Sequence, residues 1–329
     1  MFATNLPILL RRQRDTLSYR SRRSAPGLPG ALIHAAGGLV RRPPARRSPA
    51  VVSSLPPVSF SVTTGRGIAS EVRVFGTDGP PLVFLHGTTG LFDDEPMLRA
   101  LSTRSRFRVF APALPGYGPE AVDSGETQLD DMLDVTLHGW DLVDAIKAEV
   151  GVSGPVHLVG QDVGAMIAAE MAVVARHDVA RLGLVSPLGM WVASAPIPDI
   201  FAMLPFEFPG ALFSDVALGT QLLTKGLDFE DPKAIEAFQV RNSRRLGFMG
   251  KLLFPVPNRR LSTRAYRISA PTHVVWGSSD KLTPVDSYRA AWDSAITKAT
   301  STVVNDAGHS VHVEQGELCA RIIGDFLAG

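Results

Sequence analysis

The sequence predicts an α/β fold, in which helices flank a mostly parallel sheet of eight strands and a helical cap is inserted between two of the strands. From Val58 onward, short β-branched runs alternate with helical patterns, as is typical of parallel sheets. One long stretch, residues 188–262, interrupts this alternation. The chain has 329 residues, 45% of them hydrophobic and 20% charged, which is enough to build the core of one large domain.

The strands and helices are predicted in a regular order. Apolar and β-branched runs give strands at 58–64, 70–76, 82–86, 107–112, 156–160, 181–186, 272–277 and 300–304. Apolar periodicity gives helices at 94–103, 127–149, 163–176, 284–296 and 312–327. The stretch 188–262 contains seven Pro and eight Phe residues and no strand pattern, which predicts the helical cap. The predicted domains are a leader at 1–57, core segments at 58–187 and 263–329, and the cap at 188–262.

The leader differs from the rest of the chain in charge. Residues 1–70 contain 11 Arg and a single acid, Asp15, for a net charge of +10, whereas residues 71–329 contain 22 basic and 31 acidic residues, for −9. Pro, Gly and Ser separate the Arg pairs, so we expect residues 1–57 to be disordered. The leader is compatible with an organellar transit peptide or with a misassigned start, and otherwise we expect a cytoplasmic protein.

Several classes of protein are excluded by composition and motifs. The single Cys319 rules out disulfides within the chain and thiolate zinc sites. Every long uncharged run is broken by Pro or Gly, so no membrane span is expected. The acidic body argues against nucleic acid as a partner. No dinucleotide-binding or Walker motif and no metal-ligand spacing is present, so we expect neither cofactor nor metal. The sequence does not predict an oligomeric state.

The most informative segment is the strand-to-helix turn at 160–164, Gly-Gln-Asp-Val-Gly. Glycines two residues either side of the centre suit a sharp turn, because side chains there would collide with neighbouring backbone. The turn places Asp162 above the carboxyl end of the sheet and at the positive end of a helix, where its carboxylate stays ionised. The alternative is that Asp162 is an ordinary helix N-cap.

Three more loops place polar residues at strand ends. They contain His86, Gly87 and Thr88 after the third predicted strand, Asp280 after the seventh and His309 after the eighth. Ligands of α/β sheets bind at the carboxyl ends of the strands. We therefore expect these loops to meet near the turn at 160–164.

These loops resemble those of the α/β-hydrolase fold, and the resemblance covers roughly residues 58–329. It rests on the His-Gly loop at 86–87, the LPGYG turn at 114–118, the Gly-x-Asp-x-Gly elbow, Asp280 and His309. Their order agrees with the family order of nucleophile, acid and His. Most members place Ser at the elbow. Asp162 makes this chain similar to the branch that contains epoxide hydrolases and haloalkane dehalogenases.

The resemblance implies a particular chemistry for Asp162. A carboxylate is suited to displacement at a saturated carbon, which leaves an alkyl ester on Asp162. Water activated by His309, which Asp280 orients, then hydrolyses that ester. The backbone N–H groups of Thr88 and Val163 are the expected oxyanion hole. The substrate is expected to be small and hydrophobic, because the Phe-rich cap predicts an apolar pocket.

The chain departs from both branches at the residues that define their activities. Haloalkane dehalogenases follow the nucleophile with Trp, where this chain has Val163; epoxide hydrolases use two cap Tyr residues, and 188–262 contains none. We expect epoxide opening rather than carbon–halogen cleavage, because the halide-binding Trp is the more damaging loss. The candidate substrate contacts are His86, Gly87, Trp191 and Tyr266, with Trp191 or His138 as a substitute donor; His86, His138 and Tyr266 also suit structural roles.

Two alternatives remain open from the sequence. In the first, Asp162 is not the nucleophile but a general base in ester, lactone or carbon–carbon bond hydrolysis. In the second, the chain is a ligand-binding protein on a hydrolase scaffold.

Overall fold

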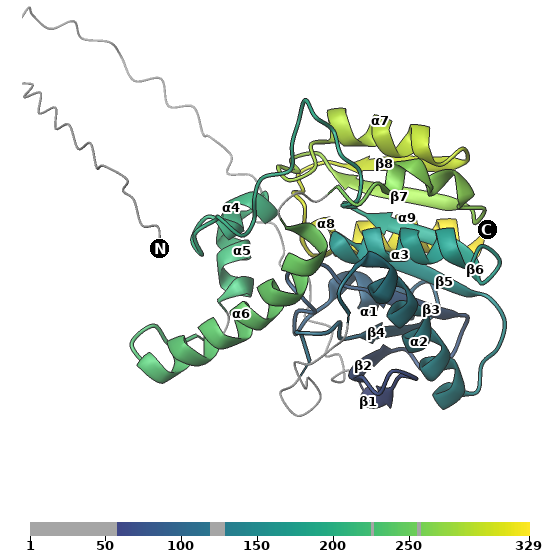
Figure 1. Ribbon diagram of the computed structural model, residues 1–329, viewed down its shortest axis with the longest axis horizontal. Helices are drawn as coiled ribbons and strands as arrows, with labels where there is room; N and C mark the ends of the chain where they lie inside the picture. Colours follow the sequence, from purple (N-terminus) through teal and green to yellow (C-terminus); the bar gives the residue numbers. More distant parts are fainter. Residues whose placement is uncertain (1–57, 119–128, 225–226, 255–257) are drawn as a thin grey trace, which may run out of the picture. The chain divides into compact units, whose positions relative to one another are not determined.

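The computed structural model describes residues 58–118, 129–224, 227–254 and 258–329, and all structural statements refer to these ranges. The predicted leader at 1–57 lies outside them. Figure 1 shows a central sheet with helices on both faces and a group of helices, α4 to α6, to one side of it.

The sheet has eight strands, as predicted, in the order β1-β2-β4-β3-β5-β6-β7-β8. β1 pairs with β2 and β2 with β4 in antiparallel register, and all the other pairs are parallel. The strands are β1 Val58–Thr63, β2 Ala69–Phe75, β3 Pro81–Leu85, β4 Arg108–Pro112, β5 Val156–Gln161, β6 Val179–Val185, β7 Thr272–Gly277 and β8 Ala299–Val304.

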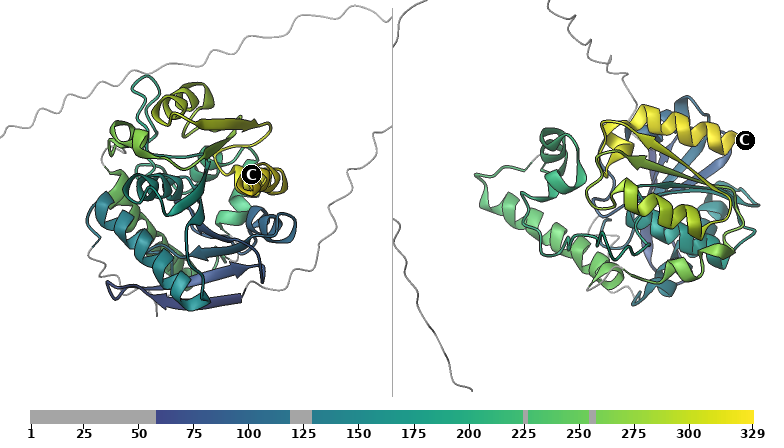
Figure 2. Two further views of the ribbon diagram at one scale, coloured as in Figure 1. Left: turned by 90° about the vertical axis from the view of Figure 1, so that its right-hand side faces the viewer. Right: turned by 90° about the horizontal axis from the view of Figure 1, so that it is seen from above.

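Helices cover both faces of this sheet. α1 and α9 lie together on one face, and α2 and α3 lie on the other (Figure 2). The bounds are α1 Pro96–Thr103, α2 Met132–Val150, α3 Val163–Val174, α7 Val285–Ala295, α8 Val311–Glu314 and α9 Gly316–Ala328. The prediction of a single helix at 312–327 is wrong, because the helical conformation is interrupted at Gln315, between α8 and α9. Gly316 lies against α1, where a Cβ would come 2.7 Å from Pro96.

The core is densest around β5 and α3. β5 is buried along almost its whole length, and α3 is buried from Val163 to Val173. A helix that is apolar on all sides is expected in such a buried position. The charged residue in this helix, Glu170, forms a bidentate pair with Arg264. The turn between β5 and α3 therefore joins two buried elements of the core.

The helical insertion contains α4 Phe208–Leu212, α5 Val216–Leu223 and α6 Pro232–Leu253, followed by 3-10 turns at Leu261–Thr263 and Ala265–Arg267. Asp215 and Asp231 cap α5 and α6 by accepting hydrogen bonds from first-turn N–H groups. The insertion is tied to the loop after β8, because the N–H of Ser310 donates to the carbonyl of Leu212 at 2.9 Å. It also lies over the carboxyl ends of β3 and β5, because Phe208, Leu212 and Leu253 line one pocket together with Thr88 and Asp162.

Candidate active site

Asp162 lies at the tip of a sharp turn between β5 and α3. Its φ of 56° and ψ of −122° are strained for a residue with a side chain. Gly160 and Gly164 permit the turn: a Cβ at 160 would lie 2.4 Å from the Gly164 carbonyl oxygen, and one at 164 would lie 2.2 Å from the Leu85 carbonyl oxygen. Asp162 occupies the N-cap position of α3, but its side chain makes no hydrogen bond to the helix N-terminus, so it does not act as an ordinary capping side chain.

His309 lies between two carboxylates. Its Nε2 is 3.3 Å from Oδ1 of Asp162, and its Nδ1 is 2.8 Å from Oδ2 of Asp280. Asp280 is itself held in place: its Oδ1 accepts hydrogen bonds from the N–H groups of Leu282 and Thr283, and its Oδ2 accepts one from the Thr283 hydroxyl, all at 2.9 Å. The structure brings together the three residues that the sequence placed on different strands.

The loop after β3 supplies a donor to Asp162. The N–H of Thr88 donates to Oδ2 of Asp162 at 2.6 Å, and the Thr88 carbonyl accepts a hydrogen bond from the Tyr117 hydroxyl at 2.7 Å. Gly87 lets this loop approach, since a Cβ there would lie 2.6 Å from the Cβ of Asp162. Val163 occupies the first position of α3 and is fully buried, and a helix N–H at that position has no partner within its own helix.

The electrostatics of the site favour a charged resting state. Burial would lower the pKa of His309, but Asp280 and Asp162 outweigh burial and raise that pKa to about 10. Burial would raise the pKa of Asp162, but His309 and the hydrogen bond from Thr88 outweigh it and lower that pKa. A protonated imidazole therefore lies between two carboxylates at neutral pH.

The comparison with protein families matches this arrangement. A model described as "Alpha/beta hydrolase family" matches residues 82–322. The chain belongs to the alpha/beta hydrolase family. The match includes both core segments and the helical insertion, and it confirms the family expected from the sequence. It does not distinguish an Asp nucleophile from the usual Ser.

Relatives of known activity are distant. The chain is 27% identical over 275 residues to a pimeloyl-[acyl-carrier protein] methyl ester esterase of Methylococcus capsulatus, covering 76% of this chain and 95% of that protein. It is also 27% identical over 254 residues to the dihydrolipoyllysine-residue acetyltransferase component of an acetoin cleaving system of Pseudomonas putida. That alignment covers 74% of this chain and 62% of the relative, so the chain spans less than two thirds of its length.

Solved hydrolase structures share the fold. A meta-cleavage product hydrolase from Pseudomonas fluorescens superposes with a TM-score of 0.62 at 19% identity, covering 82% of this chain and 97% of that one. A 2-hydroxy-6-oxo-6-phenylhexa-2,4-dienoate hydrolase from Rhodococcus sp. gives 0.61 at 18% identity, covering 83% and 100%. At these identities the likeness establishes the fold alone.

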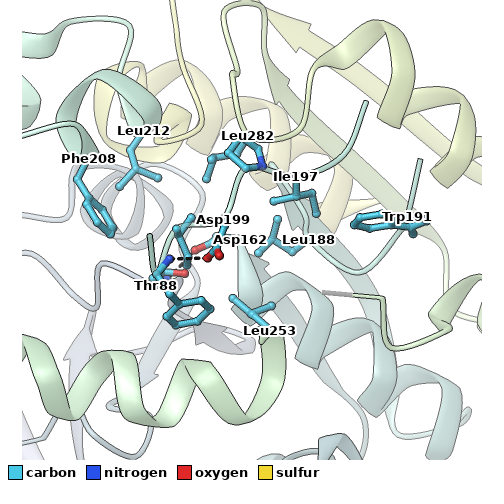
Figure 3. Close-up of a pocket in the computed structure, with 13 residues that line it drawn as sticks. Thr88, Asp162, Leu188, Trp191, Ile197, Asp199, Phe208, Leu212, Leu253 and Leu282 are labelled. Atoms are coloured by element: carbon cyan, nitrogen blue, oxygen red, sulfur yellow. Dashed lines mark hydrogen bonds between the residues drawn. The ribbon is translucent and has the colours of Figure 1, made fainter. Parts of the chain in front are cut away.

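The pocket of this hydrolase opens over Asp162 (Figure 3). Leu188 and Leu253 lie beside Asp162, whereas Phe208 and Trp191 lie at opposite sides of the pocket. The cavity measures about 80 Å³, and a water molecule in the liquid takes about 30 Å³, so the space suits a small molecule. The lining residues are Thr88, Asp162, Leu188, Trp191, Ile197, Pro198, Asp199, Ile200, Phe201, Phe208, Leu212, Leu253 and Leu282.

Three of the four expected substrate contacts do not line this pocket. His86 is buried behind the loop, where its Nε2 accepts from the Leu114 N–H at 2.9 Å and burial lowers its pKa to about 4. Tyr266 is 69% exposed and does not line the pocket, because the 3-10 turn that carries it faces solvent. Gly87 lies against Asp162 and does not line the pocket. Of the four candidates, only Trp191 lines the pocket.

Other residues bear on the site but were missed or misplaced by sequence reasoning. His138, considered as a substitute donor, is buried in α2 and lines no part of this pocket. Glu314 was missed: it accepts hydrogen bonds from the N–H groups of Gly308, Ser214 and Asp215 at 2.7 to 2.9 Å. It joins the His309 loop to the insertion, and its position just after the His was the available signal.

The described residues contain no group of three or more His, Cys, Asp or Glu residues arranged to hold a metal ion. In the same part of the chain, no helix combines the length and apolar character needed to cross a bilayer.

Proposed function

We propose that this chain is a cofactor-independent hydrolase that forms a covalent ester on Asp162. The observation that supports it is the difference between the two carboxylate oxygens. Oδ2 accepts the Thr88 N–H at 2.6 Å, whereas Oδ1 is buried without a hydrogen bond, 3.3 Å from His309 Nε2. Because Asp162 also lines the pocket, Oδ1 is the oxygen available for attack, and the Thr88 N–H is placed to stabilise the other oxygen.

In the first step, Oδ1 attacks a saturated carbon of the substrate. With an epoxide, the new Oδ1–C bond forms as the ring C–O bond breaks, and the ring oxygen needs a proton. Esterification removes the negative charge of Asp162, one of the groups that raise the pKa of His309. His309 therefore releases its proton as the ester forms, and this proton reaches the alkoxide through water.

In the second step, neutral His309 acts as the general base. It takes a proton from water, and the hydroxide adds to the carboxyl carbon of the ester, with the oxyanion held by the N–H groups of Thr88 and Val163. The bond between the carboxyl carbon and Oδ1 then breaks, the departing alkoxide takes the proton of the newly formed carboxyl group, and the pair of Asp162 carboxylate and His309 cation is restored. Asp280 keeps the imidazole oriented throughout, through its 2.8 Å contact with Nδ1.

We propose a small, neutral and hydrophobic substrate. Ten of the 13 lining residues are apolar or aromatic, the polar ones are Thr88, Asp162 and Asp199, and none of them is basic. An anionic substrate would meet two carboxylates and no counter-charge. Epoxide opening is favoured over carbon–halogen cleavage, because Val163 stands where dehalogenases place a halide-binding Trp. The Trp191 indole, which lines the pocket, is the candidate hydrogen-bond donor to the opening oxygen.

A second candidate function is favoured by the relatives. The similarity to a methyl ester esterase suits hydrolysis of an ester, or of a carbon–carbon bond, with Asp162 as a general base and water as the nucleophile. In that case no bond would form between the substrate and Asp162.

Trapping separates the two reactions. In His309→Gln, solvent water must supply the proton that His309 supplies in the wild type, so the ester forms more slowly, but no base then hydrolyses it. Prolonged incubation with small epoxides should therefore add the mass of one substrate to Asp162. The double variant Asp162→Asn/His309→Gln should add nothing. Turnover of a substrate by the wild type without any adduct in His309→Gln would contradict the Asp162 nucleophile.

A further inference from the structure

A second cleft lies between α6 and the turn at 116–118. Its volume is about 640 Å³, and it shares no lining residue with the Asp162 pocket. One wall is the α6 face that carries Lys233, Arg241 and Arg245, and the other is the turn around Tyr117. The catalytic scheme does not use this cleft.

The cleft concentrates positive charge. Its lining includes four cations, those of Lys233, Arg241, Arg244 and Arg245, and one carboxylate, that of Glu236. Residues 71–329 as a whole carry a net charge of −9. A local excess of cations on an acidic body attracts anions selectively to this cleft.

Arg241 and Arg245 repel each other, and Asp93 and Asp94 line a neighbouring pocket together with both of them. The two arginines lie one helical turn apart, where like charges destabilise a helix, and neither forms an ion pair within the described residues. The Arg245 guanidinium is half-buried over the Tyr117 ring, 5.4 Å from its centre. Its burial, with a smaller contribution from Arg241, lowers the pKa of Arg245. An anion bound between the two guanidinium groups would reduce their mutual repulsion.

The cleft is built by a close contact of backbone. Gly116 has a φ of +85°, and a Cβ there would lie 3.0 Å from the carbonyl oxygen of Arg244. The turn and α6 therefore approach as closely as a glycine allows, which fixes the distance between the two walls. Such a preformed site binds with little ordering cost.

We propose that this cleft binds a phosphate group through Arg241 and Arg245. Guanidinium groups match the oxygens of phosphate with paired hydrogen bonds. Lys233 lies on the same wall and adds a third positive charge. The group is either free inorganic phosphate or the phosphate of an organic monoester, since both present the same oxygens.

Calorimetric titration of the full chain with inorganic phosphate and with phenyl phosphate tests the proposal. We expect saturable binding that weakens as salt is added, and a loss of at least tenfold in affinity in Arg241→Ala/Arg245→Ala. Lys251→Ala, which removes a cation of α6 outside the cleft, should bind as the wild type does. Circular dichroism of each variant checks that α6 still forms, since Ala favours helices.

The two ligands distinguish the sources of the phosphate. Equal affinity supports free phosphate, and tighter binding of phenyl phosphate supports an organic monoester. Absence of saturable binding to the wild type, or unchanged binding in the double Arg variant, would overturn the proposal. None of these measurements depends on catalysis by Asp162.

Discussion

Gly87 leaves open the space that Asp162 needs: a Cβ at position 87 would lie 2.6 Å from the Cβ of Asp162 and 2.8 Å from its Oδ2. The residue that follows, Thr88, donates its N–H to this same oxygen. The absence of a side chain at 87 therefore lets the Thr88 N–H, the proposed oxyanion donor, come close to Asp162, the proposed nucleophile.

Gly87→Ala should move this loop away from Asp162. Loss of one oxyanion-hole donor lowers kcat by about 10²- to 10³-fold in a comparable site, and we expect a loss of that order. The added Cβ would also lie 2.0 Å from Oε1 of buried Gln161, so stability should fall by about 1–3 kcal/mol. Steady-state kinetics with a turned-over epoxide would measure the fall in kcat. Gly65→Ala, where a Cβ meets nothing within 4 Å, should retain full activity. Equal activity of both variants would contradict the proposed role of the loop.

Tyr117→Phe should hold the loop that carries Thr88 less firmly in position. The variant loses the 2.7 Å hydrogen bond to the Thr88 carbonyl, so kcat should fall several-fold while KM changes little. Tyr288→Phe is the matched control, because its hydroxyl also donates to a backbone carbonyl, that of Ala195, at 2.8 Å. Both changes should cost about 1 kcal/mol of stability, and a fall in kcat of the same size in both would indicate a structural effect alone.

The rate of ester formation should remain high into the alkaline range. It is fastest with ionised Asp162, whose pKa is lowered, and with protonated His309, whose pKa is raised to about 10 and which supplies the proton to the opening oxygen. We therefore expect kcat/KM for an epoxide to be level across neutral pH and to fall above about pH 10. By linkage, the His309 pair stabilises the fold fully below the ordinary His pKa, and this stability is lost as the pH rises through 10. A kcat/KM that rises with a pKa near 6.5 would instead indicate a neutral His309 in the free enzyme.

Asp199→Asn should improve the turnover of anionic substrates relative to neutral ones. Asp199 lines the pocket and accepts a hydrogen bond from the Phe201 N–H. Wild type should strongly prefer a neutral epoxide over its carboxylate analogue, and the ratio of kcat/KM should shrink about tenfold in the variant. Asp228→Asn is a close control: it accepts the same kind of bond, from the Glu230 N–H, but lies outside the pocket lining. An unchanged ratio in Asp199→Asn would show that the charge of Asp199 does not select the substrate.

The parts of this molecule that sequence predicts best are those with local signals. The eight strands follow from β-branched runs, and the elbow follows from Gly160 and Gly164, whose missing side chains leave room for backbone. Asp280 and His309 follow strand ends, and parallel strands bring such ends together. Each of these signals lies within a few residues of the strand, turn or side chain that it predicts.

The pocket contacts could not be predicted in the same way. Tyr266 and His86 have the right chemistry, but the direction of a side chain from a loop depends on how the insertion packs. His86 instead accepts the Leu114 N–H, and Glu314 accepts the N–H groups of Ser214 and Asp215 in the insertion. Both arrangements depend on contacts between residues far apart in sequence, which no local pattern encodes.

The most direct test of the account is a single turnover of epoxide by excess wild-type enzyme in ¹⁸O-labelled water. If Asp162 forms an ester, water adds to its carboxyl carbon, so one labelled oxygen should appear in the peptide that contains Asp162. The diol released in that turnover should carry no label. Labelled diol together with an unlabelled Asp162 would mean that water attacks the substrate directly and would contradict the covalent mechanism.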